Sequence, residues 1–182
     1  MMKSKNLVGK FLKQILHGAG AISFAVAYLT ADSESFRVLH VYCGYGFGII
    51  FIIRILVGLF PSSGISLHTI WRRATLAKSI YTDIKNLEIN RLLNWQRWYG
   101  ATMGLIIFSM YALVPPMILA GIGSYEELGG KLARKIMENS HETVGEMYLL
   151  MVTTHLLLIA IRYFLGKYKE LSISTTKKPL AN

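Results

Sequence analysis

Cysteine is almost absent from this sequence, since Cys43 is the only one among 182 residues. One thiol cannot form an intramolecular disulfide, a zinc site of several thiolates, or a Cys-x-x-Cys motif that attaches a cofactor covalently. Acidic residues are also few, with 10 Asp and Glu against 20 Lys and Arg, which gives a net charge of +10. A cofactor therefore cannot be attached covalently through a Cys-x-x-Cys motif.

Long apolar stretches dominate the sequence, which is 53% hydrophobic with a mean hydropathy of +0.41. Residues 14–31, 36–60, 98–121 and 141–165 each approach the roughly 20 residues that a helix needs to cross a membrane. In lipid the backbone must satisfy its own hydrogen bonds, which favours helices. We predict an all-α integral membrane four-helix bundle, with residues 1–182 as one domain. A cleaved signal peptide is the alternative for the first stretch.

The distribution of positive charge predicts the orientation in the membrane. Most basic residues precede the first stretch, separate the second from the third, or follow the fourth: Lys3, Lys5, Lys10, Lys13, Arg72, Arg73, Lys78, Lys85, Arg91, Lys167, Lys169, Lys177 and Lys178. The other side carries fewer, namely Arg37, Lys131, Arg134 and Lys135, among several acidic residues. This positive-inside pattern predicts that both termini are cytoplasmic. It also predicts that the basic residues lie next to membrane lipid and that the protein does not bind nucleic acid.

The cytoplasmic connection at about residues 65–90 has its own pattern. Apolar residues recur there at helical spacing among basic ones: Leu67, Ile70, Trp71, Leu76, Ile80, Ile84 and Leu87. We expect a basic amphipathic helix on the inner leaflet, or a surface on which a partner protein docks.

Two histidines share one face of the fourth stretch. His141 and His155 are fourteen residues apart, so in a helix they point within about 40° of each other and lie roughly 21 Å apart along the axis. Ionisable side chains inside an apolar span are costly and indicate function. Neutral imidazole is an axial ligand of haem iron, so this helix is predicted to hold two stacked haems.

Two more histidines lie in the apolar stretches at matching depths. His17 is near the cytoplasmic end of the first stretch and His40 near the outer end of the second. The depths pair His17 with His155 and His40 with His141. Because the sequence lacks a Cys-x-x-Cys-His motif, the haems are predicted to be two non-covalent haem b groups.

The second stretch offers further residues around His40. Gly44 and Gly48 follow it at i+4 and i+8, which leaves a smooth groove on the same face. Arg37 lies near the outer depth, and Arg54 lies fourteen residues after His40, at the inner depth. These two cations are candidates to bind haem propionates, or they extend to the two membrane surfaces.

The third stretch contains no histidine, and we expect it to support packing. Asn94, with Gln96 and Arg97, precedes it and is a candidate to hydrogen-bond a quinone head group, although the nearby Trp and Tyr residues are also typical interfacial anchors. Pro115 and Pro116 predict that its helix kinks or ends near the outer side. A longer outer loop of mixed charge is expected over residues 122–140, with a short surface helix within it as the alternative.

These residues resemble a known family. Arg-x-x-His followed by Gly-x-x-x-Gly and a later Arg in the second stretch is similar to the bacterial cytochrome b561 family, as is His-Glu-x-x-x-Gly with a second His fourteen residues on. The b-type cytochrome subunits of nickel-iron hydrogenases and formate dehydrogenases share the pattern. The resemblance implies the same two histidine pairs, location in the bacterial inner membrane, and a quinone site at Asn94.

The expected function is electron transfer between the quinone pool and a periplasmic or membrane-associated redox partner, through two haems that each have two histidine ligands. The protein would then be an electron carrier or the cytochrome subunit of a respiratory oxidoreductase, with no separate catalytic residues. A stand-alone superoxide:quinone oxidoreductase is the first alternative, although the third-span histidines of that type are missing. A haem-free membrane transporter or anchor is the second.

Overall fold

The computed structural model describes residues 2–59, 67–86 and 94–176, and the regular structure in these ranges is entirely helical. The prediction of an all-α chain is therefore confirmed for the described residues. The elements in chain order are α1 (Met2–Leu29), the 3-10 turn η1 (Glu34–Phe36), α2 (Arg37–Gly58), α3 (Leu67–Lys85), α5 (Trp95–Tyr125) and α6 (Gly130–Thr176).

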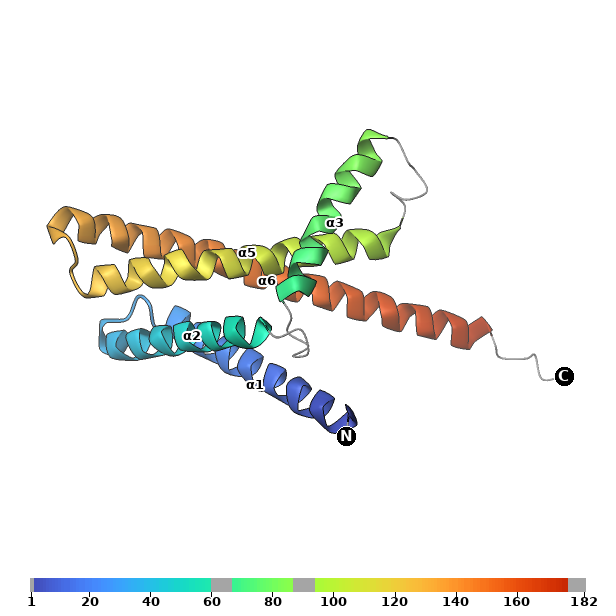
Figure 1. The fold of residues 1–182 in the computed structure, drawn as a ribbon, viewed down its shortest axis with the longest axis horizontal. Helices are drawn as coiled ribbons and strands as arrows, with labels where there is room; N and C mark the ends of the chain where they lie inside the picture. Colours follow the sequence, from blue (N-terminus) through green and yellow to red (C-terminus); the bar gives the residue numbers. More distant parts are fainter. Residues whose placement is uncertain (1, 60–66, 87–93, 177–182) are drawn as a thin grey trace.

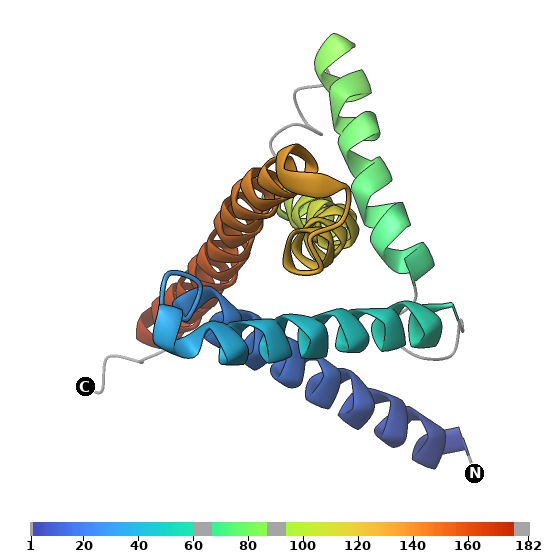
Figure 2. The same cartoon turned by 90° about the vertical axis from the view of Figure 1, so that its left-hand side faces the viewer.

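Two helical hairpins form the body of the molecule. α1 packs along α2, α5 packs along α6, and the hairpins meet where α2 contacts α5. Both hairpin turns lie at one end (Figure 1), which we call the outer end in keeping with the predicted orientation. The termini lie at the opposite, inner end. α1 and α6 diverge toward the inner end, as the end-on view in Figure 2 also shows.

Three helical segments are long and apolar enough to cross a membrane within the described ranges: Glu34–Gly58, Trp95–Tyr125 and Gly130–Lys167. They coincide with the second, third and fourth predicted stretches. α1 covers the first stretch as a continuous helix, but it is not among the three, since Lys13, Gln14 and His17 reduce its apolar character.

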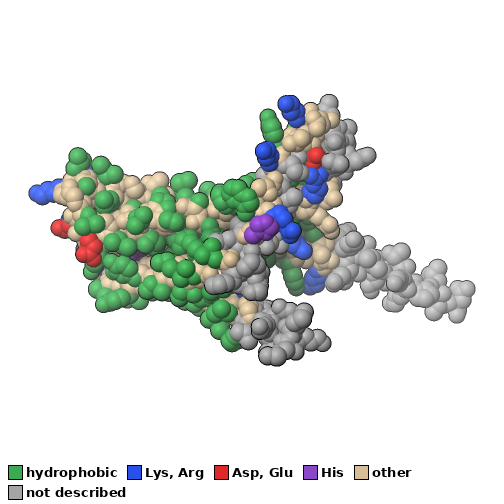
Figure 3. Space-filling view, in the orientation of Figure 1, with side chains coloured by type: hydrophobic (Ala, Val, Ile, Leu, Met, Phe, Trp, Pro, Cys, Tyr) green, Lys and Arg blue, Asp and Glu red, His purple; other side chains and the backbone are tan. Residues whose placement is uncertain are grey.

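The apolar surface of the bundle is typical of contact with lipid. Large apolar side chains cover the two hairpins between their charged ends (Figure 3). Leu29 is 81% exposed and Leu119 is 69% exposed, a pattern that would favour aggregation in water. Few side chains among the described residues are buried, and Phe47, Val114, Met117 and Tyr148 form a buried cluster between the helices.

The structure corrects the predictions for the outer end of the third stretch. α5 continues through Pro115 and Pro116 to Tyr125, so the prolines do not end it. Transmembrane helices tolerate proline because neighbouring helices, or small local changes in helix geometry, satisfy the carbonyl groups that lose their hydrogen bonds. The long loop predicted over residues 122–140 is also wrong. The chain reverses between Tyr125 and Gly130, with positive φ at Glu127 and Gly129, and α6 begins about ten residues before His141.

α3 (Leu67–Lys85) confirms that the connection between the second and third stretches contains a helix, and its cytoplasmic location stays a prediction. It crosses the inner part of α5, where the Trp71 and Phe108 rings lie 5.9 Å apart and Arg97 forms an ion pair of 2.7 Å with Asp83. Lys78, Arg72 and Lys85 are exposed. Contact of this helix with a lipid leaflet or a partner protein stays a prediction.

Candidate functional site

His40 on α2 and His141 on α6 face each other at the outer end. Their ring centroids are 5.9 Å apart and the ring planes are perpendicular. The Nδ1 atom of His40 donates to the Ala27 carbonyl at 2.8 Å, and that of His141 donates to the Met117 carbonyl at 2.8 Å. A carbonyl oxygen only accepts, so both neutral rings carry their proton on Nδ1. Each Nε2 therefore presents a lone pair that can bind a metal.

The separation of these rings suits one metal ion between two imidazoles. Metal–nitrogen bonds of about 2 Å, together with the half-width of each ring, account for a centroid distance of about 6 Å. Hydrogen bonding of Nδ1 to a carbonyl is the usual way in which ligating histidines are oriented. The geometry of His40 and His141 therefore fits the predicted haem ligands.

A cavity of about 460 Å³ lies beside this pair, within the usual range for ligand sites. Its lining includes His40, His141, Arg37 and Gly44, which are the residues predicted for the outer haem. A side chain at Gly44 would meet nothing within 4 Å, so this glycine leaves open space next to His40. Gly48 differs, because a Cβ there would contact Ile118 at 3.5 Å. Gly48 thus lies at the contact between α2 and α5, and its predicted place in the haem groove stays a prediction.

Gly121, which lies on α5 against the outer pair, could not be predicted from the sequence. A Cβ at Gly121 would lie 2.8 Å from Cε1 and Nδ1 of His141. Because Gly121 has no side chain, the His141 ring on α6 can reach the carbonyl of Met117, which lies on α5 like Gly121. No periodic pattern marks this glycine, because its contact depends on how α5 and α6 pack.

Arg54 on α2 organises the inner end. Its Nη1 donates to Nδ1 of His17 on α1 at 3.2 Å, and its Nε donates to the hydroxyl of Tyr111 on α5 at 3.1 Å. Arg54, His155 and Lys13 also interact electrostatically with the His17 ring. The structure thus brings the predicted inner residues His17, His155 and Arg54 into one region.

The two inner histidines differ in their surroundings. His155 is half-buried, and its Nδ1 is a buried atom that has no hydrogen-bond partner among the described residues. No protein group among the described residues fixes the tautomer of this ring, so its Nε2 can carry the lone pair that a metal needs. His17 is exposed, and its Nδ1 accepts from Arg54, so a neutral ring carries its proton on Nε2. Binding iron through Nε2 requires His17 to move this proton to Nδ1.

An aromatic layer separates the two ends. Tyr148 lies seven residues from both His141 and His155, and its ring is 4.7 Å from Phe24 and 5.7 Å from Phe47. Two helical turns correspond to about 10 Å along the axis, so this layer lies midway between the two histidine depths. The two histidine regions are therefore distinct sites on either side of a packed core.

Comparison with known protein families identifies the family of this chain. The family model described as prokaryotic cytochrome b561 matches residues 11–173. The chain belongs to the prokaryotic cytochrome b561 family. It is therefore a membrane electron-transfer cytochrome of a family that binds b-type haem, as the sequence predicted. No curated protein and no solved structure matches the chain.

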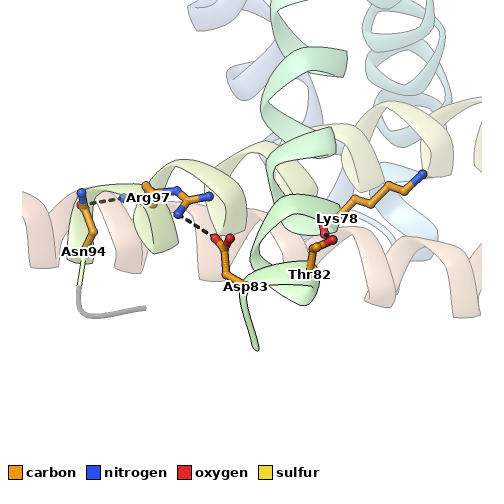
Figure 4. A network of polar contacts seen from close by, with 5 residues as sticks. All are labelled: Lys78, Thr82, Asp83, Asn94 and Arg97. Carbon is orange, nitrogen blue, oxygen red and sulfur yellow. Dashed lines mark hydrogen bonds and ion pairs between the residues drawn. The ribbon is translucent and has the colours of Figure 1, made fainter. Parts of the chain in front are cut away.

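In this b561-family cytochrome, Asn94 has a clear local role. It is the N-cap of α5, and its side-chain oxygen accepts from the backbone N–H groups of Gln96 at 3.1 Å and Arg97 at 3.3 Å. Figure 4 shows Asn94 next to the ion pair between Arg97 and Asp83, which ties α5 to α3. The predicted quinone contact at Asn94 would have to coexist with this capping role, and it stays a prediction.

Proposed function

We propose that this cytochrome carries electrons across the bacterial inner membrane between the quinone pool and a periplasmic or membrane-associated redox partner, through two b haems. His40 and His141 would hold the outer haem, and His17 and His155 the inner haem. The observation that carries this proposal is the facing pair of His40 and His141, each with Nδ1 bound to a backbone carbonyl.

At the outer end, the residues of the chain do three things for a haem. The carbonyls of Ala27 and Met117 fix the tautomer and orientation of the two ligands. Gly44 leaves room beside His40. Arg37 lines the same cavity and is placed to pair with a propionate.

At the inner end, Arg54 supplies the fixed positive charge. It lies beside His17 and could pair with a propionate once His17 binds iron. The haem itself supplies one-electron redox chemistry at its iron. Two histidine ligands would leave that iron without an open position, which would disfavour oxygen binding at the metal.

We further propose that α1 is the fourth membrane span and that both termini are cytoplasmic. α1 packs along α2, and the contact between His17 and Arg54 places His17 at the depth of Arg54. The basic residues before the first span and after the fourth favour this orientation. The region around Asn94 would then face the cytoplasmic side of the membrane, where a quinone head group could bind.

The test is a haem count on the purified chain. A pyridine haemochrome assay with a reduced-minus-oxidised spectrum should give two b haems per polypeptide. One haem would mean that one of the two histidine pairs does not bind haem. A colourless protein would exclude electron transfer by haem in this chain.

A further inference from the structure

Tyr111 on α5 makes two contacts with Arg54. Its hydroxyl accepts from Nε of Arg54 at 3.1 Å, and the guanidinium carbon lies 5.8 Å from the centre of its ring. The Tyr111 ring is itself held by Phe51, at a centroid distance of 5.4 Å. Tyr111 therefore holds the Arg54 guanidinium by a hydrogen bond and a ring contact.

These contacts fix the direction in which Arg54 points. A long cationic side chain in an apolar helix tends to extend toward the nearest membrane surface. Arg54 instead lies across the bundle, from Tyr111 on α5 to His17 on α1. Because Tyr111 binds Nε, the Nη groups are left to act at the inner site, and one of them reaches His17.

We propose that Tyr111 is a positioning residue that holds Arg54 beside the inner histidine pair and thereby raises the reduction potential of the haem bound there. This inference rests on the proposed function. A fixed positive charge in a low-dielectric site favours the reduced iron, which carries one positive charge fewer than the oxidised iron. A mobile Arg54 would be better solvated and would stabilise the reduced state less.

The experiment is a redox titration of the detergent-purified protein, followed by its haem absorbance. His155→Ala first identifies the inner potential as the one that disappears. Tyr111→Phe removes the hydroxyl and keeps the ring against Phe51. We expect two haems, an unchanged outer potential, and an inner potential lowered by about 59 mV, which is a tenfold shift toward the oxidised state for one electron.

Two comparisons make the result specific. Tyr42→Phe on α2 is the matched control, because Tyr42 is 72% exposed on the bundle surface, and it should leave both potentials unchanged. Arg54→Gln should lower the inner potential at least as much as Tyr111→Phe does. The double variant should then match Arg54→Gln alone, since residues that act through one contact are not additive.

The possible outcomes separate this inference from the proposed function. Loss of the inner haem from Tyr111→Phe would overturn this inference, because Tyr111 would then be needed for haem binding and not for the potential of a bound haem. Two haems with an unchanged inner potential in Tyr111→Phe would overturn it, as would a Tyr111 effect that persists in the Arg54→Gln background. Loss of both haems would also overturn it, by showing that Tyr111 serves the packing of the whole bundle. A wild-type protein without haem would refute the proposed function instead.

Discussion

His40 and His141 come from two different hairpins, and their rings are perpendicular with centroids 5.9 Å apart. Each ring donates a hydrogen bond to a backbone carbonyl on the neighbouring helix of its own hairpin. Ala27 on α1 holds His40, and Met117 on α5 holds His141. All four long helices thus contribute to the outer site, so the site forms only when both hairpins pack together.

Replacing one outer histidine should remove one haem and spare the other. We expect His40→Ala and His141→Ala each to bind one haem in place of two, because the aromatic layer separates the two sites. His68→Ala is the control, since His68 is exposed on α3, and it should keep both haems. The haemochrome assay measures the ratio. Loss of both haems from either variant would contradict the independence of the sites.

A methyl group at Gly121 should disturb the outer site. Gly121→Ala would place a Cβ at 2.8 Å from the His141 ring and push the ring away from the Met117 carbonyl. Loss of such a supporting contact typically weakens metal binding by about tenfold or more. Titration of the haem-depleted variant with haem should show this loss at the outer site. Gly166→Ala, where a Cβ meets nothing within 4 Å, should bind haem normally.

Two substitutions at Asn94 can separate helix capping from quinone binding. Asn94→Ala removes the cap and should cost about 1 kcal/mol of stability. Asn94→Ser keeps a capping oxygen but loses the amide, so its stability should match that of the wild type. If the amide binds quinone, reduction of the haems by a quinol should be roughly fivefold slower in Asn94→Ser, as expected for one lost hydrogen bond. Equal rates would remove Asn94 from the quinone site.

The ion pair between Asp83 and Arg97 should respond unequally to its two substitutions. The Asp83 side chain is 7% exposed and that of Arg97 is 27% exposed. Arg97→Leu leaves a carboxylate buried beside α5 and should cost about 3 kcal/mol, whereas Asp83→Asn should cost about 1 kcal/mol because Arg97 can reach solvent. Thermal unfolding followed by tryptophan fluorescence measures the difference. Equal losses of stability in the two variants would show that the difference in burial between Asp83 and Arg97 does not determine the cost of breaking the ion pair.

The four-span topology can be tested with single cysteines, since Cys43 is the only native one. In a Cys43→Ser background, Ser35→Cys in the outer turn should react with a membrane-impermeant maleimide in intact spheroplasts. Ser4→Cys near the N-terminus should react only after the membrane is permeabilised. Labelling of Ser4→Cys in intact spheroplasts would mean that α1 does not cross the membrane.

The sequence alone was sufficient for every feature that depends on local periodicity. Apolar stretches of membrane length predicted the helices, and the fourteen-residue interval between His141 and His155 predicted two ligands on one face. Both follow from the regular rise and rotation of an α-helix, which any residue in the helix shares. Helix length follows less directly. Pro115 and Pro116 were expected to kink or end a helix, and the structure shows that the helix continues through them to Tyr125.

Only the tertiary structure decided which atoms support those ligands. The Met117 carbonyl bonds His141 from 24 residues away, and the Tyr111 hydroxyl bonds Arg54 from 57 residues away. Gly121 likewise matters because α5 and α6 pack closely where His141 lies. Such contacts depend on the rotation and depth of one helix against another, and no spacing within a single helix records them. Sequence periodicity therefore predicted the four candidate ligands, whereas helix packing determined the orientation of their rings and the charge beside them.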